Sequence, residues 1–142
     1  MSDAPESGMY FASERAPEGA ALASPTWLDL DAIDPVEFVR GLRFRTVVGE
    51  RMLVNFATYA PGTIVPEHAH EEEQVTFVLE GEFEFTMDGE TRTMIPGMVA
   101  HVPPFVPHAA RTRETGCVQV DVFAPPRRVL LEALRARETG GS

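Results

Sequence analysis

Two histidines stand one residue apart in the stretch Gly62-Thr-Ile-Val-Pro-Glu-His68-Ala-His70-Glu-Glu-Glu-Gln74, which is followed by a glycine at position 81. In an extended strand, alternate side chains point to the same face, so His68 and His70 would aim two imidazoles at one point. A turn at residues 71–73, which we expect to be a solvated loop, would bring Gln74 back beside the pair, where its carbonyl oxygen is a neutral ligand. This pattern predicts half of a metal site, against the alternative of a chance histidine pair and a solvent-facing glutamine.

The segments on both sides of this stretch favour β-structure. Runs typical of strands occur at residues 43–48, 51–60, 63–70, 74–79, 82–87, 90–95, 99–102, 108–113 and 117–123. Short turns separate them, and Asp88-Gly89 is a strong signal for a two-residue hairpin turn. Many short strands at this spacing predict an all-β sandwich or barrel.

The two ends of the chain differ in character from its middle. Residues 1–24 are rich in Ala, Ser, Glu, Gly and Pro, which is typical of a mobile tail. Residues 25–128 form the predicted domain, in which we expect an edge strand at residues 27–30 and one helical turn at residues 34–39. After Pro125-Pro126 apolar residues recur at helical spacing, so residues 129–142 are expected to form a short C-terminal helix and tail.

The composition argues against several classes of function. The formal net charge of −10 would repel a phosphate backbone, so nucleic acid is not an expected partner. The chain contains no lysine, which excludes Schiff-base chemistry, and its five serines lie near the ends, which argues against a serine triad in the core. No apolar run approaches the roughly 20 residues of a membrane span, and residues 1–23 do not resemble a secretory signal. We therefore expect a cytoplasmic protein with no membrane partner.

The other two histidines lie later in the chain. His108 follows the segment Pro103-Pro-Phe-Val-Pro107, whose prolines restrict the backbone where a strand begins, and a third imidazole there would close the site. His101 alternates with Val102, and the pattern leaves open which of the two faces inward.

The last predicted strand carries an unusual polar face. Gln119, Asp121 and Phe123 alternate with three valines, and the valine face is the expected packing face. An aspartate in such a strand either faces solvent or lines a cavity with a partner. Arg127 lies beyond two prolines, where it pairs with Asp121, binds a substrate carboxylate, or is a surface residue at the start of a helix.

Two motifs resemble those of the cupin superfamily. Gly62-x5-His68-x-His70-x3-Gln74-x6-Gly81 is similar to the first cupin motif, with Gln where Glu is usual. Gly97-x5-Pro103-x4-His108 is similar to the second, although Phe105 stands where Gly is usual and Thr112 where Asn is usual. The resemblance covers residues 27–128 and implies an all-β, cupin-type double-stranded β-helix, which is a jelly-roll sandwich or barrel.

The chain further resembles single-domain cupins of pectin degradation, which convert unsaturated uronates to a linear keto form. The similar segments include Phe77-Val-Leu-Glu-Gly-Glu-Phe83 and Asp121-Val-Phe-Ala-Pro-Pro-Arg127. This resemblance implies a homodimer and one divalent metal ion bound by His68, His70, Gln74 and His108. It also implies that Asp121, Phe123 and Arg127 take part in catalysis. The acidic Glu71 and Glu72 and the unusual His101 depart from the group and put a uronate substrate in doubt.

Together these residues predict a metal-dependent, non-redox enzyme acting on a small carbonyl or enol substrate, as an isomerase, a ring-opening enzyme or a cyclase. Asp121 would move a proton and Arg127 would anchor a carboxylate or enolate. The ligand set suits Zn, Ni, Fe and Mn. Three alternatives stay open: a polyketide cyclase, to whose cupin relatives the chain is also similar, a mononuclear-iron dioxygenase, and a non-catalytic cupin that binds a small molecule.

Overall fold

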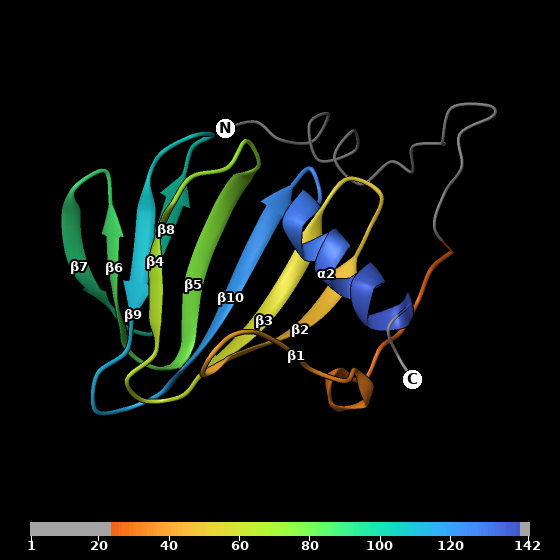
Figure 1. The fold of residues 1–142 in the computed structure, drawn as a ribbon, viewed down its shortest axis with the longest axis horizontal. Coiled ribbons are helices and arrows are strands. Elements are labelled where there is room, and N and C mark those ends of the chain that lie inside the picture. The colour runs from red at the N-terminus through yellow and green to blue at the C-terminus, as the bar shows by residue number, and fades with distance from the viewer. Residues whose placement is uncertain (1–23, 140–142) are drawn as a thin grey trace, which may run out of the picture.

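The protein, described here by a computed structural model that covers residues 24–139, consists of two antiparallel β-sheets and one C-terminal helix (Figure 1). The larger sheet has six strands in the order β1-β2-β3-β10-β5-β8, and the smaller has four in the order β4-β9-β6-β7. The elements are η1, a 3-10 helix (Leu30–Ala32), β1 (Val36–Val39), β2 (Leu42–Val48), β3 (Leu53–Tyr59), β4 (Ile64–His68), β5 (Glu73–Gly81), β6 (Phe83–Met87), β7 (Glu90–Met94), β8 (Val99–Val102), β9 (His108–Arg111), β10 (Cys117–Ala124) and α2 (Arg128–Thr139). The predicted all-β jelly-roll class is confirmed.

The turn between β6 and β7 shows why the strand predictions succeed locally. Met87 pairs with Glu90, so the loop is the two-residue Asp88-Gly89. Both residues have positive φ, 50° and 84°, as a type I′ turn requires. Asparagine, aspartate and glycine tolerate this conformation best, and the predicted hairpin is therefore present.

Two predictions near the N-terminal end of the described chain are wrong. Residues 34–39 do not form a helical turn; β1 pairs antiparallel with β2, and Phe38 stacks on Phe44 with ring centroids 5.3 Å apart. Residues 27–30 are not an edge strand, because Asp29 caps η1 by accepting a hydrogen bond from the backbone of Asp31. Pairing with β2 outweighs the local helix signal of Pro35.

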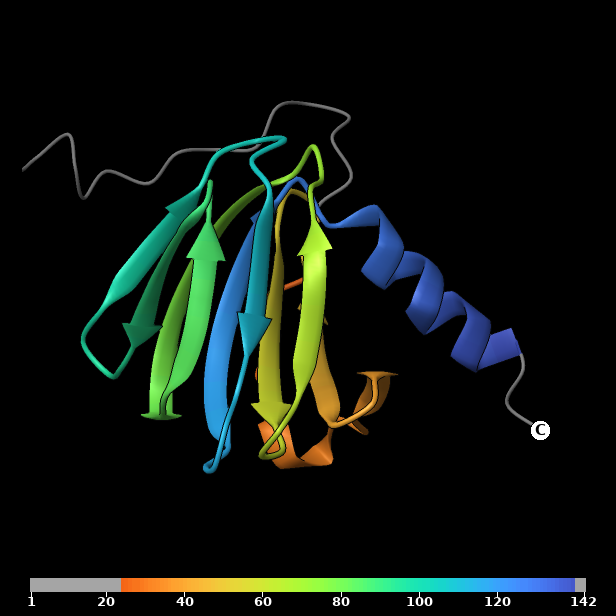
Figure 2. The ribbon, with the colours of Figure 1, turned by 60° about the vertical axis from the view of Figure 1, so that its left-hand side comes forward.

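The C-terminal helix is present as predicted and begins at Arg128. Figure 2 shows α2 running outward from the sheets, and Leu130 in its first turn is buried in the core cluster. The predicted tail at residues 1–23 lies outside the described residues, as do residues 140–142. The domain boundaries and the homodimer stay predictions. Across residues 24–139, no helix combines the length and the apolar character that crossing a membrane requires.

The inner face of β10 corrects a further expectation. Its polar side, with Gln119, Asp121 and Phe123, is buried and lines the space between the sheets. The alternating valines therefore lie on the outer face of the larger sheet, so the predicted packing face is wrong. The polar side chains face inward because they hydrogen-bond to each other and to β5, which removes the cost of burying them.

Candidate metal centre

Three histidines lie together, two on neighbouring strands of the smaller sheet and one just beyond the end of a strand. His68 ends β4 and pairs in register with His108, which begins β9. His70 lies just after the end of β4, outside the strand that the alternation argument assumed. The nitrogens available as ligands all lie within 4.8 Å of one another. His101 is exposed on β8, where its Nε2 lies 2.6 Å from Glu73 Oε2, and it does not join this cluster.

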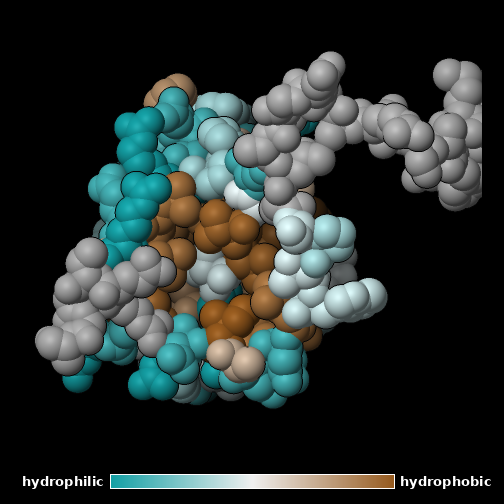
Figure 3. Space-filling model, turned by 90° about the vertical axis from the view of Figure 1, so that its right-hand side faces the viewer, coloured by the Kyte–Doolittle hydropathy of each residue, from teal (hydrophilic) through white to brown (hydrophobic). Residues whose placement is uncertain are grey.

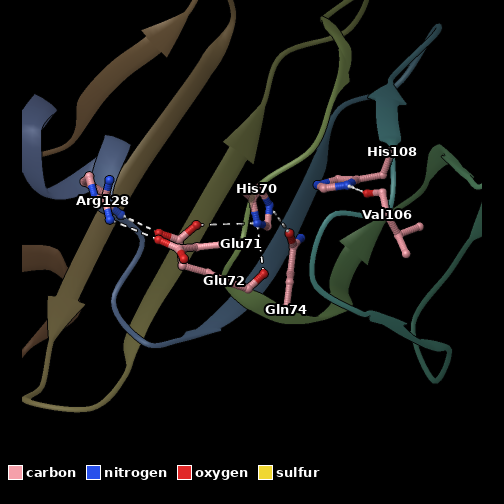
Figure 4. Close-up of polar contacts among 7 residues, drawn as sticks. All are labelled: His70, Glu71, Glu72, Gln74, Val106, His108 and Arg128. Atoms are coloured by element: carbon pink, nitrogen blue, oxygen red, sulfur yellow. Dashed lines mark hydrogen bonds and ion pairs between the residues drawn. The ribbon is translucent and has the colours of Figure 1, made fainter.

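Each imidazole of the cluster donates its Nδ1–H to a backbone carbonyl oxygen. The distances are 2.8 Å from His68 to Pro66, 2.9 Å from His70 to Glu72 and 2.8 Å from His108 to Val106, and Figure 4 shows the last two. A carbonyl oxygen only accepts, so the proton sits on Nδ1 and each Nε2 presents a lone pair. Burial lowers the pKa of all three imidazoles, that of His108 to about 4, so the rings are neutral at neutral pH.

Gln74 lies beside this cluster, as the predicted turn at residues 71–73 requires. Its Oε1 is 3.1 Å from His70 Nε2, while its Nε2 donates to Thr76 Oγ1 at 2.7 Å and to Asp121 Oδ1 at 3.1 Å. The carboxylate oxygen accepts, so the amide nitrogen must face it and the amide oxygen must face His70. Two lone pairs therefore point at each other, which is favourable only when a cation lies between them.

The donor set fits a divalent metal ion as that cation. A proton on His70 would also separate the two lone pairs, but burial and the charge of Arg127 lower the pKa of this imidazole. His108 Nε2 is buried and has no hydrogen-bond partner among the described residues, as expected of a ligand atom. Backbone carbonyls on the opposite ring nitrogens orient the imidazoles, an arrangement typical of metal-binding histidines. The three histidines thus indicate a metal site.

Asp121 extends the polar network away from the histidines. Its Oδ1 accepts hydrogen bonds from Thr76 Oγ1 at 2.6 Å, Gln119 Nε2 at 2.7 Å and Gln74 Nε2 at 3.1 Å. Its Oδ2 accepts none from the described residues. Burial raises the pKa of Asp121, although these donors and Arg127 act in the opposite direction. A carboxyl group with a raised pKa and one uncommitted oxygen is suited to hold or release a proton.

Arg127 reaches the same space from the segment between β10 and α2. Its Cζ lies 5.4 Å from the centroid of the Phe123 ring, whose edge-on contact with His70 spans 5.6 Å between centroids. The Nε of Arg127 is buried and has no partner among the described residues. Among these residues it forms no ion pair with Asp121. Burial lowers the pKa of Arg127, although the charges of Asp121 and Glu72 act in the opposite direction. Its donors thus remain available to an anionic group.

A cavity of about 290 Å³ lies between β1, β2, β3, β5 and β10 of the larger sheet and β4, β6 and β9 of the smaller one. Its polar lining includes His68, Gln74, His108, Asp121 and Arg127. The rest of its wall is largely apolar and includes Phe38, Leu42, Phe44, Tyr59, Val65 and Phe85. Figure 3 faces the β1 edge of the larger sheet and shows apolar side chains gathered on this side of the molecule. His68, His108, Asp121 and Arg127 therefore lie in an otherwise apolar surrounding, where charges interact more strongly than in water.

The sequence did not identify two residues near this cavity. Glu72, expected in a solvated loop, is only 5% exposed and accepts a hydrogen bond of 2.9 Å from the backbone N–H of Arg128 at the start of α2 (Figure 4). Glu71 contacts the guanidinium of Arg128 at 3.0 Å, so the loop after β4 holds the helix. Thr76 shares the inward face of β5 with Gln74, and strand alternation from Gln74 would have found it.

The profile of the Cupin domain family matches residues 55–123, from β3 to the end of β10. Residues 55–123 of this chain are thus a cupin domain. The matched range contains all three clustered histidines, Gln74, and the segment with Asp121 and Phe123, but not Arg127.

Several solved structures resemble this one. An RmlC-like cupin from Shewanella frigidimarina is 27% identical, with a TM-score of 0.70 over 75% of this chain and 96% of that chain. KdgF from Halomonas sp. is 22% identical, with a TM-score of 0.71 over 75% and 99% of the two chains. The polyketide cyclase RemF from Streptomyces resistomycificus is 20% identical, with a TM-score of 0.68 over 74% and 82%. At such identities the last two likenesses show a shared fold.

Proposed function

We propose that this cupin is a metal-dependent, non-redox enzyme that acts on a small carbonyl or enol substrate, as an isomerase, a ring-opening enzyme or a cyclase. One observation carries the proposal: the side chain of Gln74 joins the histidine cluster to Asp121. Its oxygen faces His70 and its nitrogen faces the carboxylate. A group that can exchange a proton is therefore held next to the site where a cation fits.

His68, His70, Gln74 and His108 would hold the ion. A bound Zn, Ni, Fe or Mn ion would supply a Lewis acid that polarises a carbonyl or enol oxygen. Because all four side chains are neutral, they leave the charge of the ion undiminished. The backbone carbonyls on the Nδ1 atoms keep the three rings in place before a substrate arrives.

Asp121 and Arg127 would supply the remaining chemistry. Oδ1 of Asp121 is held by three donors, so the uncommitted Oδ2 is the oxygen that takes a proton from the substrate or returns it. The buried Nε–H of Arg127 is available to donate a hydrogen bond to a carboxylate or a developing enolate. The guanidinium group lies over the ring of Phe123, which holds it in position. The apolar wall excludes water, which strengthens both interactions.

Two substrate classes follow from the likenesses. The resemblance to uronate-ketonising cupins suggests an unsaturated uronate, whereas the polyketide cyclase RemF shares the fold and acts on a different class. The aromatic and aliphatic wall of the cavity offers few partners for the many hydroxyl groups of a sugar acid. This wall favours a largely apolar substrate that closes into rings, and hence the cyclase alternative.

The proposal is tested by replacing Asp121 with Asn. The carboxamide oxygen can still accept the three donors, so we expect unchanged metal content by elemental analysis and a loss of turnover of about 10²–10⁴-fold. Turnover is followed as loss of the conjugated absorbance of an unsaturated uronate and, in parallel, as cyclisation of a linear polyketide analogue. Glu80→Gln, which neutralises an exposed carboxyl group on β5, is the matched control.

The outcomes separate the alternatives. Wild-type turnover in Asp121→Asn would remove the proton-transfer role. Oxygen consumption that accompanies turnover in the presence of iron would replace the non-redox enzyme with a dioxygenase. Tight binding without conversion of either substrate would favour a non-catalytic, ligand-binding cupin.

A further inference from the structure

Buried polar atoms without partners are concentrated in one place in this molecule. Among the described residues, four buried side-chain nitrogen or oxygen atoms make no hydrogen bond: Asn55 Nδ2, His108 Nε2, Gln119 Oε1 and Arg127 Nε. The last three belong to residues that line the cavity beside the histidine cluster. Such atoms are rare in folded proteins and call for an explanation, since each loses its hydrogen bonds to water on burial. The proposed function explains His108 and Arg127 but not Gln119.

The orientation of the Gln119 side chain is determined by its neighbour. Its Nε2 donates to Asp121 Oδ1 at 2.7 Å. The same oxygen accepts from Thr76 and Gln74, so it must be the acceptor in all three contacts. The amide nitrogen therefore faces Asp121, and the amide oxygen is turned away from it. Gln119 is 2% exposed and lines the cavity, and its buried Oε1 is left without a donor among the described residues.

The position of Gln119 along β10 places this acceptor away from the metal site. Gln74 pairs in register with Phe123, whereas Gln119 lies four residues earlier on the same inward face. Gln119 is thus about 7 Å of strand beyond Asp121 and about 13 Å beyond Phe123, at about 3.3 Å per residue. Tyr59, diagonal to Gln119 in the pairing of β3 with β10, lines the same region. A ligand seated at the histidines meets Gln119 only if it extends along β10 past Asp121.

We propose that Gln119 is a specificity-determining residue whose Oε1 accepts a hydrogen bond from a hydroxyl group at the far end of a flat, largely apolar ligand. The opposite end of that ligand, carrying an anionic or carbonyl oxygen, lies at Arg127 and the histidine cluster. The apolar wall between the two ends contacts the ring system. This inference rests on the proposed function in placing the ligand in that cavity, but it concerns recognition, not turnover.

The inference predicts a preference between matched probes. 2-Naphthoate, its 6- and 7-hydroxy derivatives and the corresponding methoxy derivatives share the carboxylate and the ring system. The methoxy group cannot donate a hydrogen bond. We expect the metal-loaded protein to bind at least one hydroxy derivative about tenfold more tightly than its methoxy partner, by calorimetric titration. Equal affinities within both pairs, or no binding of any naphthoate, would overturn the proposal without any variant being made.

Two variants then locate the preference. Gln119→Met removes the acceptor with little change in volume, and we expect it to abolish the hydroxy-over-methoxy ratio while retaining the affinity for 2-naphthoate. Thr76→Val is the matched control, because it removes another donor to the same Asp121 oxygen and leaves Gln119 Oε1 in place. The ratio should survive in Thr76→Val. Its loss in both variants would mean that Asp121, not Gln119, reads the hydroxyl group, and its survival in Gln119→Met would also overturn the proposal.

The same titrations distinguish this inference from the proposed function. The titrations measure affinity and not turnover. Wild-type turnover in Asp121→Asn would therefore contradict the catalytic role of Asp121 without changing the hydroxy-over-methoxy affinity ratio of the wild-type protein. A lost ratio with an intact effect of Asp121→Asn would contradict only the role of Gln119.

Discussion

The replacement His108→Leu should change stability in a way that depends on metal. His108 is 3% exposed, donates one hydrogen bond to Val106 O and leaves Nε2 unpaired. Without metal, leucine loses that one bond, worth about 1 kcal/mol, but removes a buried unpaired nitrogen that costs about 1–3 kcal/mol. The two terms oppose each other, so in the presence of a chelator we expect His108→Leu to be as stable as the wild type or more stable by up to about 2 kcal/mol.

With metal, the same replacement should be strongly destabilising relative to wild type. An ion present at 100 times its dissociation constant stabilises the folded state by about 2.7 kcal/mol. At about 3–5 °C per kcal/mol for a domain of this size, the melting temperature of the wild type should rise by about 8–13 °C on addition of the bound ion. His108→Leu should lose most of that rise, because a ligand nitrogen is gone.

The measurement is a thermal melt by circular dichroism, with chelator and then with Zn, Ni, Mn or Fe(II) added separately. His101→Leu is the matched control, because His101 is exposed and its one side-chain hydrogen bond among residues 24–139 is to Glu73, outside the cluster. The His101→Leu variant should keep the full rise in melting temperature on addition of metal. Equal destabilisation of His108→Leu with and without metal, or a wild type that none of the four ions stabilises, would refute the assignment of this cluster.

Three further predictions concern residues around the site. Burial raises the pKa of Asp121 in the folded protein, so the fold favours the protonated carboxyl and loses stability as pH rises through that pKa. Asp121→Asn does not titrate, so its melting temperature relative to wild type should increase between about pH 4 and about pH 7, and a constant difference would contradict the raised pKa. Glu72→Ala removes the acceptor for the first turn of α2 and should cost about 0.5–2 kcal/mol, with faster amide hydrogen exchange in that turn, whereas Glu72→Gln should retain most of the protection. Leu130→Ala should cost about 2–4 kcal/mol in urea unfolding because Leu130 is 2% exposed, while Val129→Ala, at 47% exposure, should stay within about 0.5 kcal/mol of wild type.

Several features could be read from local sequence because they depend on short-range geometry. Strand alternation and turn residues predicted β2 to β10 within a few residues, and the Asp88-Gly89 turn was identified by its tolerance of positive φ. The spacing of His68, His70 and Gln74 around one turn was enough to predict that the three would meet. The helical turn at residues 34–39 failed because its actual partner, β2, is a tertiary one.

By itself the sequence determined the all-β class and the convergence of His68 and His70, since both follow from periodicity and spacing within one stretch. The resemblance to cupins implied that His108 joins them and which ligand types are present. Only the tertiary structure decided which face of β10 lies inside, and that His101 lies outside the cluster. It also decided the direction of the Gln74 and Gln119 amides, because the hydrogen bonds that orient them converge on Asp121. Gln74 and Asp121 are 47 residues apart in the chain, and Thr76 and Asp121 are 45 apart. Strand periodicity carries no information over such separations, whereas pairing of β5 with β10 places all three side chains on one face.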